Sequence, residues 1–211
     1  MERSANIWRT SLDDQSRISE KHSTKHAMPP LWAADRCHVT ESYVSGVCVE
    51  EVAGWGWCGV AGGDSGLIAA RIDMETKAAC LKDLSKVIPT SWRPDRKVAA
   101  SSLEQLINFL RGRITPRVTL DPKGTPFATS IWKSLSGVPR GTTITYTDLC
   151  KSVGLSSHHA RAVGRAISSN PIWVLIPCHR VVGRNGCLTG YAGGLNLKQR
   201  LLDLETQTTA N

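Results

Sequence analysis

Long hydrophobic runs are missing from this sequence of 211 residues. No segment approaches the ~18 consecutive apolar residues that a membrane-spanning helix needs, and the N-terminus lacks the apolar stretch of a signal peptide. We therefore expect an intracellular protein without a membrane partner, in the nucleus of a eukaryote or the cytoplasm of a prokaryote. Hydrophobic residues make up 41% and charged residues 21% of the chain, a composition that predicts a folded globular protein and excludes a disordered, collagen-like or coiled-coil one.

Cysteines at a regular spacing are also missing. The seven cysteines are an odd number and recur at no fixed interval, so we expect reduced thiols rather than a disulfide framework. His22, His26, Cys37 and His38 have the composition of a metal site, but their spacing matches no standard zinc site. We expect no metal ligands, no structural zinc and no required cofactor.

Acidic residues are scarce in the second half of the chain. Residues 122–211 contain ten Lys and Arg but only Asp148, Asp203 and Glu205, a net charge of +7, whereas residues 1–121 contain 16 basic and 15 acidic residues. A surface with this excess of positive charge favours nucleic acid as a partner, because each neutralised phosphate releases counterions. A solvated basic face is the alternative that charge alone leaves open.

The hydrophobic pattern changes near the same point. Residues 1–40 show no sustained apolar periodicity and predict an extension, flexible or loosely packed. Residues 41–121 predict a small antiparallel sheet followed by helices. The expected strands are 43–49, 55–60 and 66–72, and the expected helices are 74–87 and 102–110. Ser101 and Glu104 have the spacing of a capping box for the second helix.

Residues 122–211 carry helix signals throughout. Thr125 and Pro126 predict the start of a helix that Gly137 ends, and Thr145 predicts the cap of a short helix through residue 153. A third helix is expected over 157–169, and its tight connection to the second indicates a helix-turn-helix, with an ordinary αα-hairpin as the alternative. We therefore predict an α/β N-terminal domain over 41–121 packed on a mainly α-helical C-terminal domain over 122–211, which contains a winged-helix-like helix-turn-helix.

The predicted third helix has two different faces. The positions expected to pack inward are Ala160, Val163, Gly164 and Ile167, and those expected to point outward are His158, Arg161, Ala162 and Arg165. Small residues between arginines permit a helix to approach a nucleic-acid groove closely. A solvated arginine face is again the alternative.

A candidate nucleophile follows a short apolar segment. The run from Ile172 to Ile176 lies between two prolines and predicts a segment buried on all sides. Cys178 comes directly after it, and His179 and Arg180 follow. Nearby positive charge lowers a thiol pKa, so Cys178 is a candidate for thiolate activation, with a buried inert cysteine as the alternative.

Several motifs in this half occur in the order of a known family. Pro177-Cys178-His179-Arg180-Val181, preceded by Asn170-Pro171 and followed by Gly190-Tyr191-Ala192-Gly193-Gly194, resembles the active-site signature of the 6-O-alkylguanine-DNA alkyltransferases. The resemblance extends over roughly residues 124–205. It implies direct-reversal DNA repair by a methylated-DNA–[protein]-cysteine S-methyltransferase, which flips 6-O-alkylguanine out of duplex DNA and transfers the alkyl group irreversibly to its own cysteine.

Other functions remain as alternatives. An alkyltransferase-like protein binds the same lesions with little or no transfer, but such proteins lack the acceptor cysteine. A Cys-His hydrolase would need a separate histidine and an oxyanion site, and a plain helix-turn-helix regulator would leave Cys178 without a role. The resemblance further implies that the partner is double-stranded DNA containing alkylated guanine, bound through the minor groove by a monomer.

The resemblance assigns catalytic roles residue by residue. Cys178 would accept the alkyl group, His179 would take its proton through a bridging water, and Glu205 would orient the imidazole. Tyr146 would turn the phosphate and help to protonate the departing guanine. Arg161 would enter the base stack in place of the extruded nucleotide.

The same resemblance implies the binding surfaces. The groove-facing helix would present Ala160, Ala162, Gly164 and Arg165 together with Arg161. Asn170 would be a hinge, and the base pocket and its lid would be formed by Pro177, Val181, Tyr191, Ala192 and Gly193. The chain departs from the family pattern at Ala192, where a serine is frequent, and at His158 and His159, where a proline and smaller residues are common.

Overall fold

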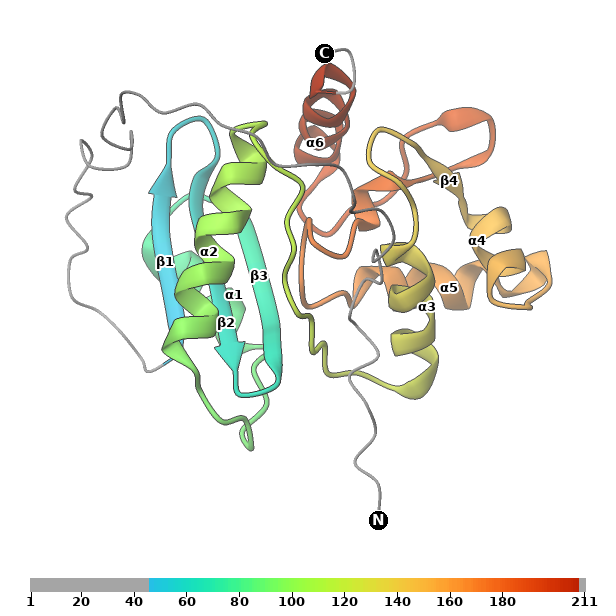
Figure 1. Ribbon diagram of the computed structural model, residues 1–211. Helices are drawn as coiled ribbons and strands as arrows, with labels where there is room; N and C mark the ends of the chain where they lie inside the picture. The colour runs from blue at the N-terminus through green and yellow to red at the C-terminus, as the bar shows by residue number, and fades with distance from the viewer. Residues whose placement is uncertain (1–45, 209–211) are drawn as a thin grey trace, which may run out of the picture.

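The computed structural model describes residues 46–208 and places a three-stranded sheet beside a group of helices (Figure 1). The strands are β1 (Val47–Val52), β2 (Gly56–Gly63) and β3 (Gly66–Met74), antiparallel neighbours in that order. The predicted small antiparallel sheet is therefore confirmed. The first strand continues past the expected end at residue 49, because a tight turn at Gly54 (φ +77°) pairs its last residues with the start of β2.

One helix covers each face of the sheet. The helix α1 (Lys77–Ser85) buries Leu84 in a small cluster on one face, and α2 (Arg96–Leu110) buries Leu106 and Phe109 in the main core on the other. Figure 1 shows α2 in front of the sheet and α1 behind it. Each face of the sheet is thereby covered, as the alternation of side chains along the strands requires.

The helix α1 begins later, and α2 begins earlier, than the sequence predicts. Because β3 continues to Met74, α1 starts only after Thr76, whose hydroxyl accepts a hydrogen bond from a first-turn N–H at 3.1 Å. The helix α2 starts at residue 96 because the Asp95 carboxylate accepts hydrogen bonds from two first-turn N–H groups, at 2.8 and 3.0 Å. Ser101 and Glu104 lie inside this helix with exposed side chains, so the predicted capping box is wrong.

The outer edge of β3 first pairs with the segment that leads out of the sheet. Leu67 forms a parallel bridge with Leu120, and its N–H donates to the carbonyl oxygen of Thr119 at 2.8 Å. Gly66 permits this approach, because its φ is +143° and a Cβ there would lie 2.6 Å from the Thr119 oxygen.

Further along, the same edge pairs with the segment that precedes Cys178. The Ala70 N–H donates to the Pro171 carbonyl at 3.0 Å, and the Ala70 carbonyl accepts from the Trp173 N–H at 3.1 Å. Ala70 and Ile172 form a parallel bridge. The sheet therefore supports the backbone of the candidate active-site segment directly.

The second half of the chain is mainly helical, as predicted. Its elements are α3 (Pro126–Ser136), α4 (Tyr146–Ser152), α5 (Ala160–Ser168), α6 (Leu195–Thr208) and the short parallel strands β4 (Ile144–Thr145) and β5 (Val181–Val182). The hydroxyls of Thr125 and Thr145 accept hydrogen bonds from the first turns of α3 and α4, which confirms both predicted caps.

The helix α5 is shorter than the predicted span of 157–169. Its first predicted turn, Ser157–His159, is a 3-10 turn, and the α-helix begins at residue 160. Of the four positions predicted to face inward, Val163 and Ile167 are buried, whereas Ala160 and Gly164 are only half-buried. Gly164 lies beside Tyr146 instead: a Cβ at Gly164 would lie 3.7 Å from the tyrosine ring.

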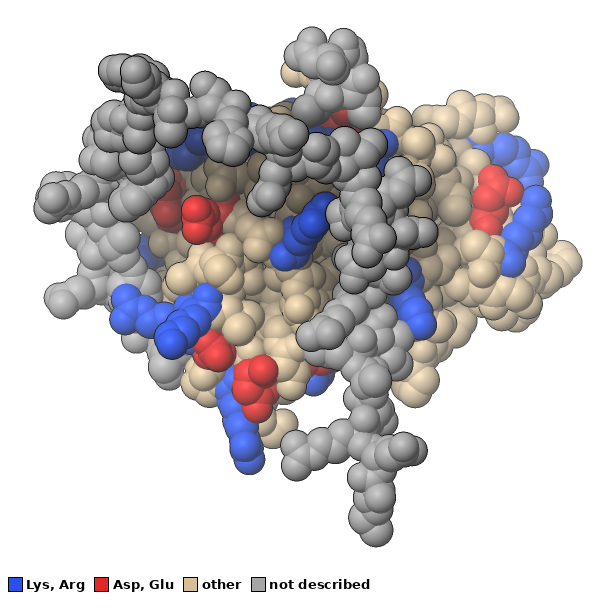
Figure 2. Space-filling view, viewed as in Figure 1, with Lys and Arg blue, Asp and Glu red and all other residues tan. Residues whose placement is uncertain are grey.

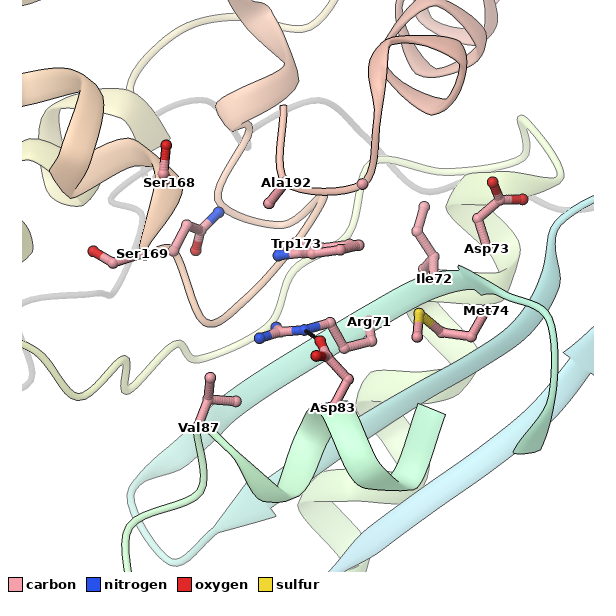
Figure 3. A pocket seen from close by; sticks show the side chains of 12 residues that line it. Arg71, Ile72, Asp73, Met74, Asp83, Val87, Ser168, Ser169, Trp173 and Ala192 are labelled. Carbon is pink, nitrogen blue, oxygen red and sulfur yellow. Dashed lines mark hydrogen bonds and ion pairs between the residues drawn. The ribbon is translucent and has the colours of Figure 1, made fainter. Parts of the chain in front are cut away.

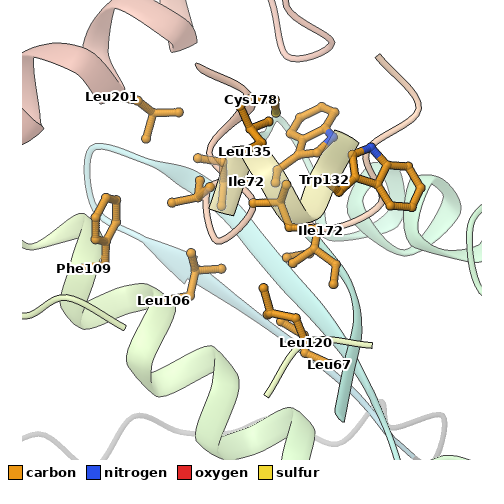
Figure 4. Packing of buried hydrophobic residues seen from close by; sticks show 14 of the residues in the cluster. Leu67, Ile72, Leu106, Phe109, Leu120, Trp132, Leu135, Ile172, Cys178 and Leu201 are labelled. Atoms are coloured by element: carbon orange, nitrogen blue, oxygen red, sulfur yellow. The ribbon is translucent and has the colours of Figure 1, made fainter. Parts of the chain in front are cut away.

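A single main hydrophobic cluster joins the two halves. It combines residues of the sheet and α2 with residues of α3, α5, α6 and the segment around Cys178 (Figure 4). Trp132 is the largest of its fully buried side chains, and its indole N–H donates to the Ala166 carbonyl at 2.7 Å, which fixes α3 against α5. The division of the chain at residues 121/122 stays a prediction.

The distribution of charge follows the sequence. On the face drawn in Figure 2, basic and acidic side chains are mixed over the sheet, while the coloured side chains of the helical half are mostly basic. Within residues 46–208, no helix has both the length and the apolar character needed to cross a membrane.

Candidate active site

Cys178 lies at the start of a 3-10 turn, Cys178–Arg180, with only 4% of its surface exposed. Its Sγ accepts a hydrogen bond from Asn170 Nδ2 at 3.1 Å. Burial raises the pKa of the thiol, although this hydrogen bond opposes the effect. The expected lowering of the pKa by the following cationic residues is therefore wrong, because burial is the largest influence on the thiol and Arg180 pairs with a carboxylate. The resting group is a protonated thiol.

His179 is fully buried beside Glu205 of α6. Its Nε2 lies 2.8 Å from Glu205 Oε1. Burial lowers the pKa of His179 despite the opposing influence of the carboxylate, so the ring is neutral, with Nε2 as donor to Glu205. The other ring nitrogen, Nδ1, is buried and makes no hydrogen bond to any described residue. Nδ1 is thus the nitrogen that can accept a proton.

Arg180 and the Gly141 N–H also hold the Glu205 carboxylate. Arg180 donates from Nε to Oε2 at 2.9 Å and from Nη2 to Oε1 at 2.7 Å, and the Gly141 N–H donates to Oε2 at 3.1 Å. Burial alone would raise the pKa of Glu205, but hydrogen bonds from His179 and Arg180 lower it to about 2. Glu205 is therefore ionised at neutral pH. Its pairing with Arg180 was not predicted from the sequence.

Asn170 stabilises the segment that carries Cys178. Its Nδ2 donates to the Ile176 carbonyl at 2.9 Å, and its Oδ1 accepts from the Ile172 N–H at 2.9 Å. Between these two points Val174 has a φ of +72°, a conformation that costs a β-branched residue about 1–3 kcal/mol. The surrounding contacts must therefore hold this segment in place.

Of the predicted lid residues, Tyr191 lies beside the thiol. The Tyr191 ring packs on Trp173 with 5.9 Å between centroids, and burial and the adjacent Cys178 thiol raise the pKa of Tyr191 well above its ordinary value. Gly193 makes this contact possible, because a Cβ there would lie 3.0 Å from the rings of both Trp173 and Tyr191. Ala192, at the surface, follows Tyr191 directly.

The other predicted pocket residues, Pro177 and Val181, lie directly before and directly after the Cys178–Arg180 turn. Pro177 is buried immediately before Cys178, and Val181 is buried in β5, opposite Ile144. Lys198 of α6 is fully buried and donates to the Thr189 carbonyl at 2.7 Å and to the Val181 carbonyl. It thus joins the active-site strand to the lid loop. The spacing of Lys198 with buried Leu201 and Glu205 could have indicated this inward position.

The exposed face of α5 borders an open groove next to the lid loop. Arg161 and Arg165 are exposed there, while Ala162 is half-buried. The groove has a volume of about 620 Å³ and is lined by Tyr146, Arg161, Gly164, Arg165, Ser168, Ser169 and Gly190. The structure therefore brings Tyr146 of α4 together with the predicted DNA-binding residues.

A second pocket, of about 430 Å³, is lined by residues of both the sheet and the active-site segment (Figure 3). Arg71 of β3 and Asp83 of α1 line it on one side, and Trp173 and Ala192 line it on the other. No sequence pattern predicted that the sheet contributes a side chain to this pocket.

Some predictions about metals and thiols fall partly outside the structure. His22, His26, Cys37 and His38 lie outside the described residues. The six cysteines within residues 46–208 are all unpaired.

Known proteins resemble this chain over the same region. The family model for the 6-O-methylguanine DNA methyltransferase DNA-binding domain matches residues 126–207. The methylated-DNA–protein-cysteine methyltransferase of Mycobacterium bovis is 43% identical over 117 residues, which are 55% of this chain and 70% of that protein. The protein of the same name from Methanosarcina acetivorans is 42% identical over 119 residues, 56% of this chain and 76% of its own.

Solved structures agree. The crystal structure of Mycobacterium tuberculosis OGT in complex with DNA has a TM-score of 0.62 and 35% identity, covering 77% of this chain and 92% of that one. The O6-methylguanine-DNA methyltransferase of Pyrococcus kodakaraensis has a TM-score of 0.56 and 28% identity, covering 75% and 97% of the two chains. On this evidence, the chain belongs to the methylated-DNA–protein-cysteine methyltransferase family and is an enzyme of that class.

Proposed function

We propose that this protein repairs 6-O-alkylguanine by flipping the nucleotide out of duplex DNA and transferring the alkyl group irreversibly to Cys178. The observation that carries the proposal is the arrangement of Cys178, Asn170, His179 and Glu205 in one buried cluster beside a groove lined by arginines. The target atom of a stacked base is out of reach, so extrusion of the nucleotide must precede the reaction.

Side chains of this protein account for each proton transfer in the proposed reaction. The Cys178 proton moves to His179 Nδ1 through a bridging water, and Glu205 stabilises the imidazolium that forms. The sulfur then forms a bond to the alkyl carbon while the bond from that carbon to the guanine oxygen breaks. Tyr146 donates a proton to the departing guanine and regains one by way of solvent from His179. No cofactor is required, because the chain supplies the nucleophile, the base and the acid.

The product makes each molecule act once. A thiolate is a poor leaving group from an alkyl carbon, so the thioether formed on Cys178 is not readily reversed. One molecule of protein is therefore inactivated for each alkyl group that it removes.

The surface of α5 supports an approach through the minor groove. Arg161 and Arg165 are exposed, and the small residues between and beside them permit close contact with the DNA backbone. We propose that α4 and α5 act as a winged-helix-like helix-turn-helix and that Arg161 fills the space left by the extruded nucleotide. One chain carries all of these groups, so a monomer suffices.

A comparison of the wild type with Cys178→Ser tests this function. Both proteins should bind a duplex with a single 6-O-methylguanine, but only the wild type should remove the methyl group, as followed by loss of the lesion in the digested DNA. If the wild type binds the lesion tightly and leaves it intact, the protein is a lesion-binding relative without transfer activity, and the proposal is wrong.

A further inference from the structure

Arg71 is a sheet residue whose guanidinium is buried against the active-site segment. Only 5% of its surface is exposed. Its Nη1 donates to the Pro171 carbonyl at 2.6 Å and to the Ala70 carbonyl at 2.9 Å, and its Nε donates to the Asp83 carboxylate. The guanidinium carbon also lies 4.8 Å from the centroid of the Trp173 ring (Figure 3). The side chain therefore holds both the backbone and a side chain of this segment.

The contact continues from Trp173 to the reacting sulfur. The Trp173 ring packs on Tyr191, which is half-buried and has its buried hydroxyl next to Cys178. Asn170 fixes the same segment from its other side, through the Ile172 N–H and the Ile176 carbonyl. The segment with the left-handed Val174 is thus held between Asn170 and Arg71.

We infer that Arg71 is a positioning residue for alkyl transfer: it holds Trp173, and through it Tyr191, in the arrangement that aligns Cys178 with the flipped base. This inference rests on the proposed function, and it gives the N-terminal sheet a part in the reaction. Arg71 does not line the groove beside Arg161, so its loss should not weaken DNA binding.

Arg200 offers a matched control, because it reaches from the helical half of the chain to the sheet. Arg200 of α6 makes the same three kinds of contact toward the sheet: an ion pair with Asp73 at 2.8 Å, a hydrogen bond to the Gly54 carbonyl and a stack on Trp55 at 4.4 Å. Gly54 and Trp55 lie in the β1–β2 turn, and Asp73 lies near the end of β3, where it lines the same pocket as Arg71. Replacing Arg200 removes a comparable set of contacts between the helical half and the sheet. It removes no contact to the segment that precedes Cys178.

The experiment compares the wild type, Arg71→Gln, Arg71→Lys and Arg200→Gln at a temperature where circular dichroism shows every variant to be folded. The first measurement is the single-turnover rate of methyl transfer from a saturating duplex with one 6-O-methylguanine, together with the dissociation constant for that duplex. The second is the rate at which iodoacetamide modifies Cys178, followed by peptide mapping, which requires no alkylguanine.

Arg71→Gln should slow transfer about tenfold or more, because small displacements of reacting groups are costly, while its dissociation constant stays within about twofold of the wild type. Iodoacetamide should modify Cys178 faster in this variant, since Tyr191 no longer covers the sulfur as firmly. Arg71→Lys restores a donor to the Pro171 carbonyl and should recover part of the rate; it carries the test if Arg71→Gln does not fold. Arg200→Gln should match the wild type in both reactions.

Equal transfer rates for folded Arg71 and Arg200 variants would overturn the inference. If the wild type transfers no methyl group, the proposed function fails, and the iodoacetamide comparison still decides the role of Arg71: faster modification in the Arg71 variants than in Arg200→Gln supports it, and equal modification contradicts it.

Discussion

Glu205 Oε1 lies 2.8 Å from His179 Nε2, and neither side chain has any exposed surface. The helix α6 carries the carboxylate to this position, 26 residues beyond the histidine. A buried carboxylate is stable only when it is paired, and Arg180 and the Gly141 N–H also donate hydrogen bonds to it. The pair fixes the tautomer of His179 and leaves Nδ1 as the proton acceptor.

Replacement of Glu205 should destabilise the protein by an amount that depends on pH. The folded pKa of about 2 lies below the ordinary 4.5, so Glu205 contributes stability that is complete above pH 4.5 and is lost as the pH falls toward 2. Glu205→Gln should lower the free energy of unfolding by about 3 kcal/mol at pH 7, because Arg180 then stays buried without its partner. Urea unfolding across this pH range should show the deficit shrinking as the pH falls. Asp203→Asn, an exposed change on the same helix, should show no such trend; an equal pH trend in both variants would contradict the account.

The rate of transfer should depend on pH through His179. Burial lowers the pKa of His179 below its ordinary 6.5, so the imidazole remains a base as the pH falls through 6.5. We expect a single-turnover rate at saturating DNA that is flat around pH 6.5 and decreases only under more acidic conditions. A half-maximal rate at or above pH 6.5 would argue that another group is the base.

Asn170→Ala should destabilise the protein because it leaves buried backbone groups without partners. The Ile172 N–H and the Ile176 carbonyl both lose their hydrogen bonds to the amide. The expected loss is about 3 kcal/mol in the free energy of unfolding, measured with urea. Asn196→Ala, at an exposed position of α6, is the control and should change stability by less than about 0.5 kcal/mol. A loss for Asn170→Ala as small as that of the control would remove the proposed support.

Arg161→Ala should slow repair of duplex DNA more than reaction with free 6-O-methylguanine. An intercalating side chain offsets part of the cost of extruding the nucleotide, and that cost does not arise for a free base. The measurement is the ratio of the two rate constants, with Lys133→Ala on the exposed side of α3 as the charge-matched control. If both rate constants fall by the same factor in Arg161→Ala, this arginine does not fill the stack.

Much of the helical half could be predicted from local signals. Thr125 and Thr145 cap their helices because a threonine before a helical run offers its hydroxyl to the first turn. The apolar run from Ile172 to Ile176 likewise indicated the buried segment that precedes Cys178. The α2 capping box was wrong because two residues at the right spacing do not exclude a better cap earlier in the chain, at Asp95.

The contacts between distant segments could not be predicted from local patterns. Neither the periodicity nor the composition of β3 indicates that Arg71 lies on Trp173, because the pairing depends on the edge of the sheet meeting the segment around residue 172. The same holds for the pKa of Cys178, since nearby basic residues suggest a lowered value and only the fold shows that burial raises it.

The most direct test of the central claim is the intact mass of the protein after incubation with a duplex that contains one 6-O-methylguanine, followed by peptide mapping. The account predicts the addition of a single methyl group on the peptide that carries Cys178, with one equivalent of lesion lost for each molecule of protein modified. An unchanged mass despite loss of the lesion, or a methyl group on any other residue, would contradict it.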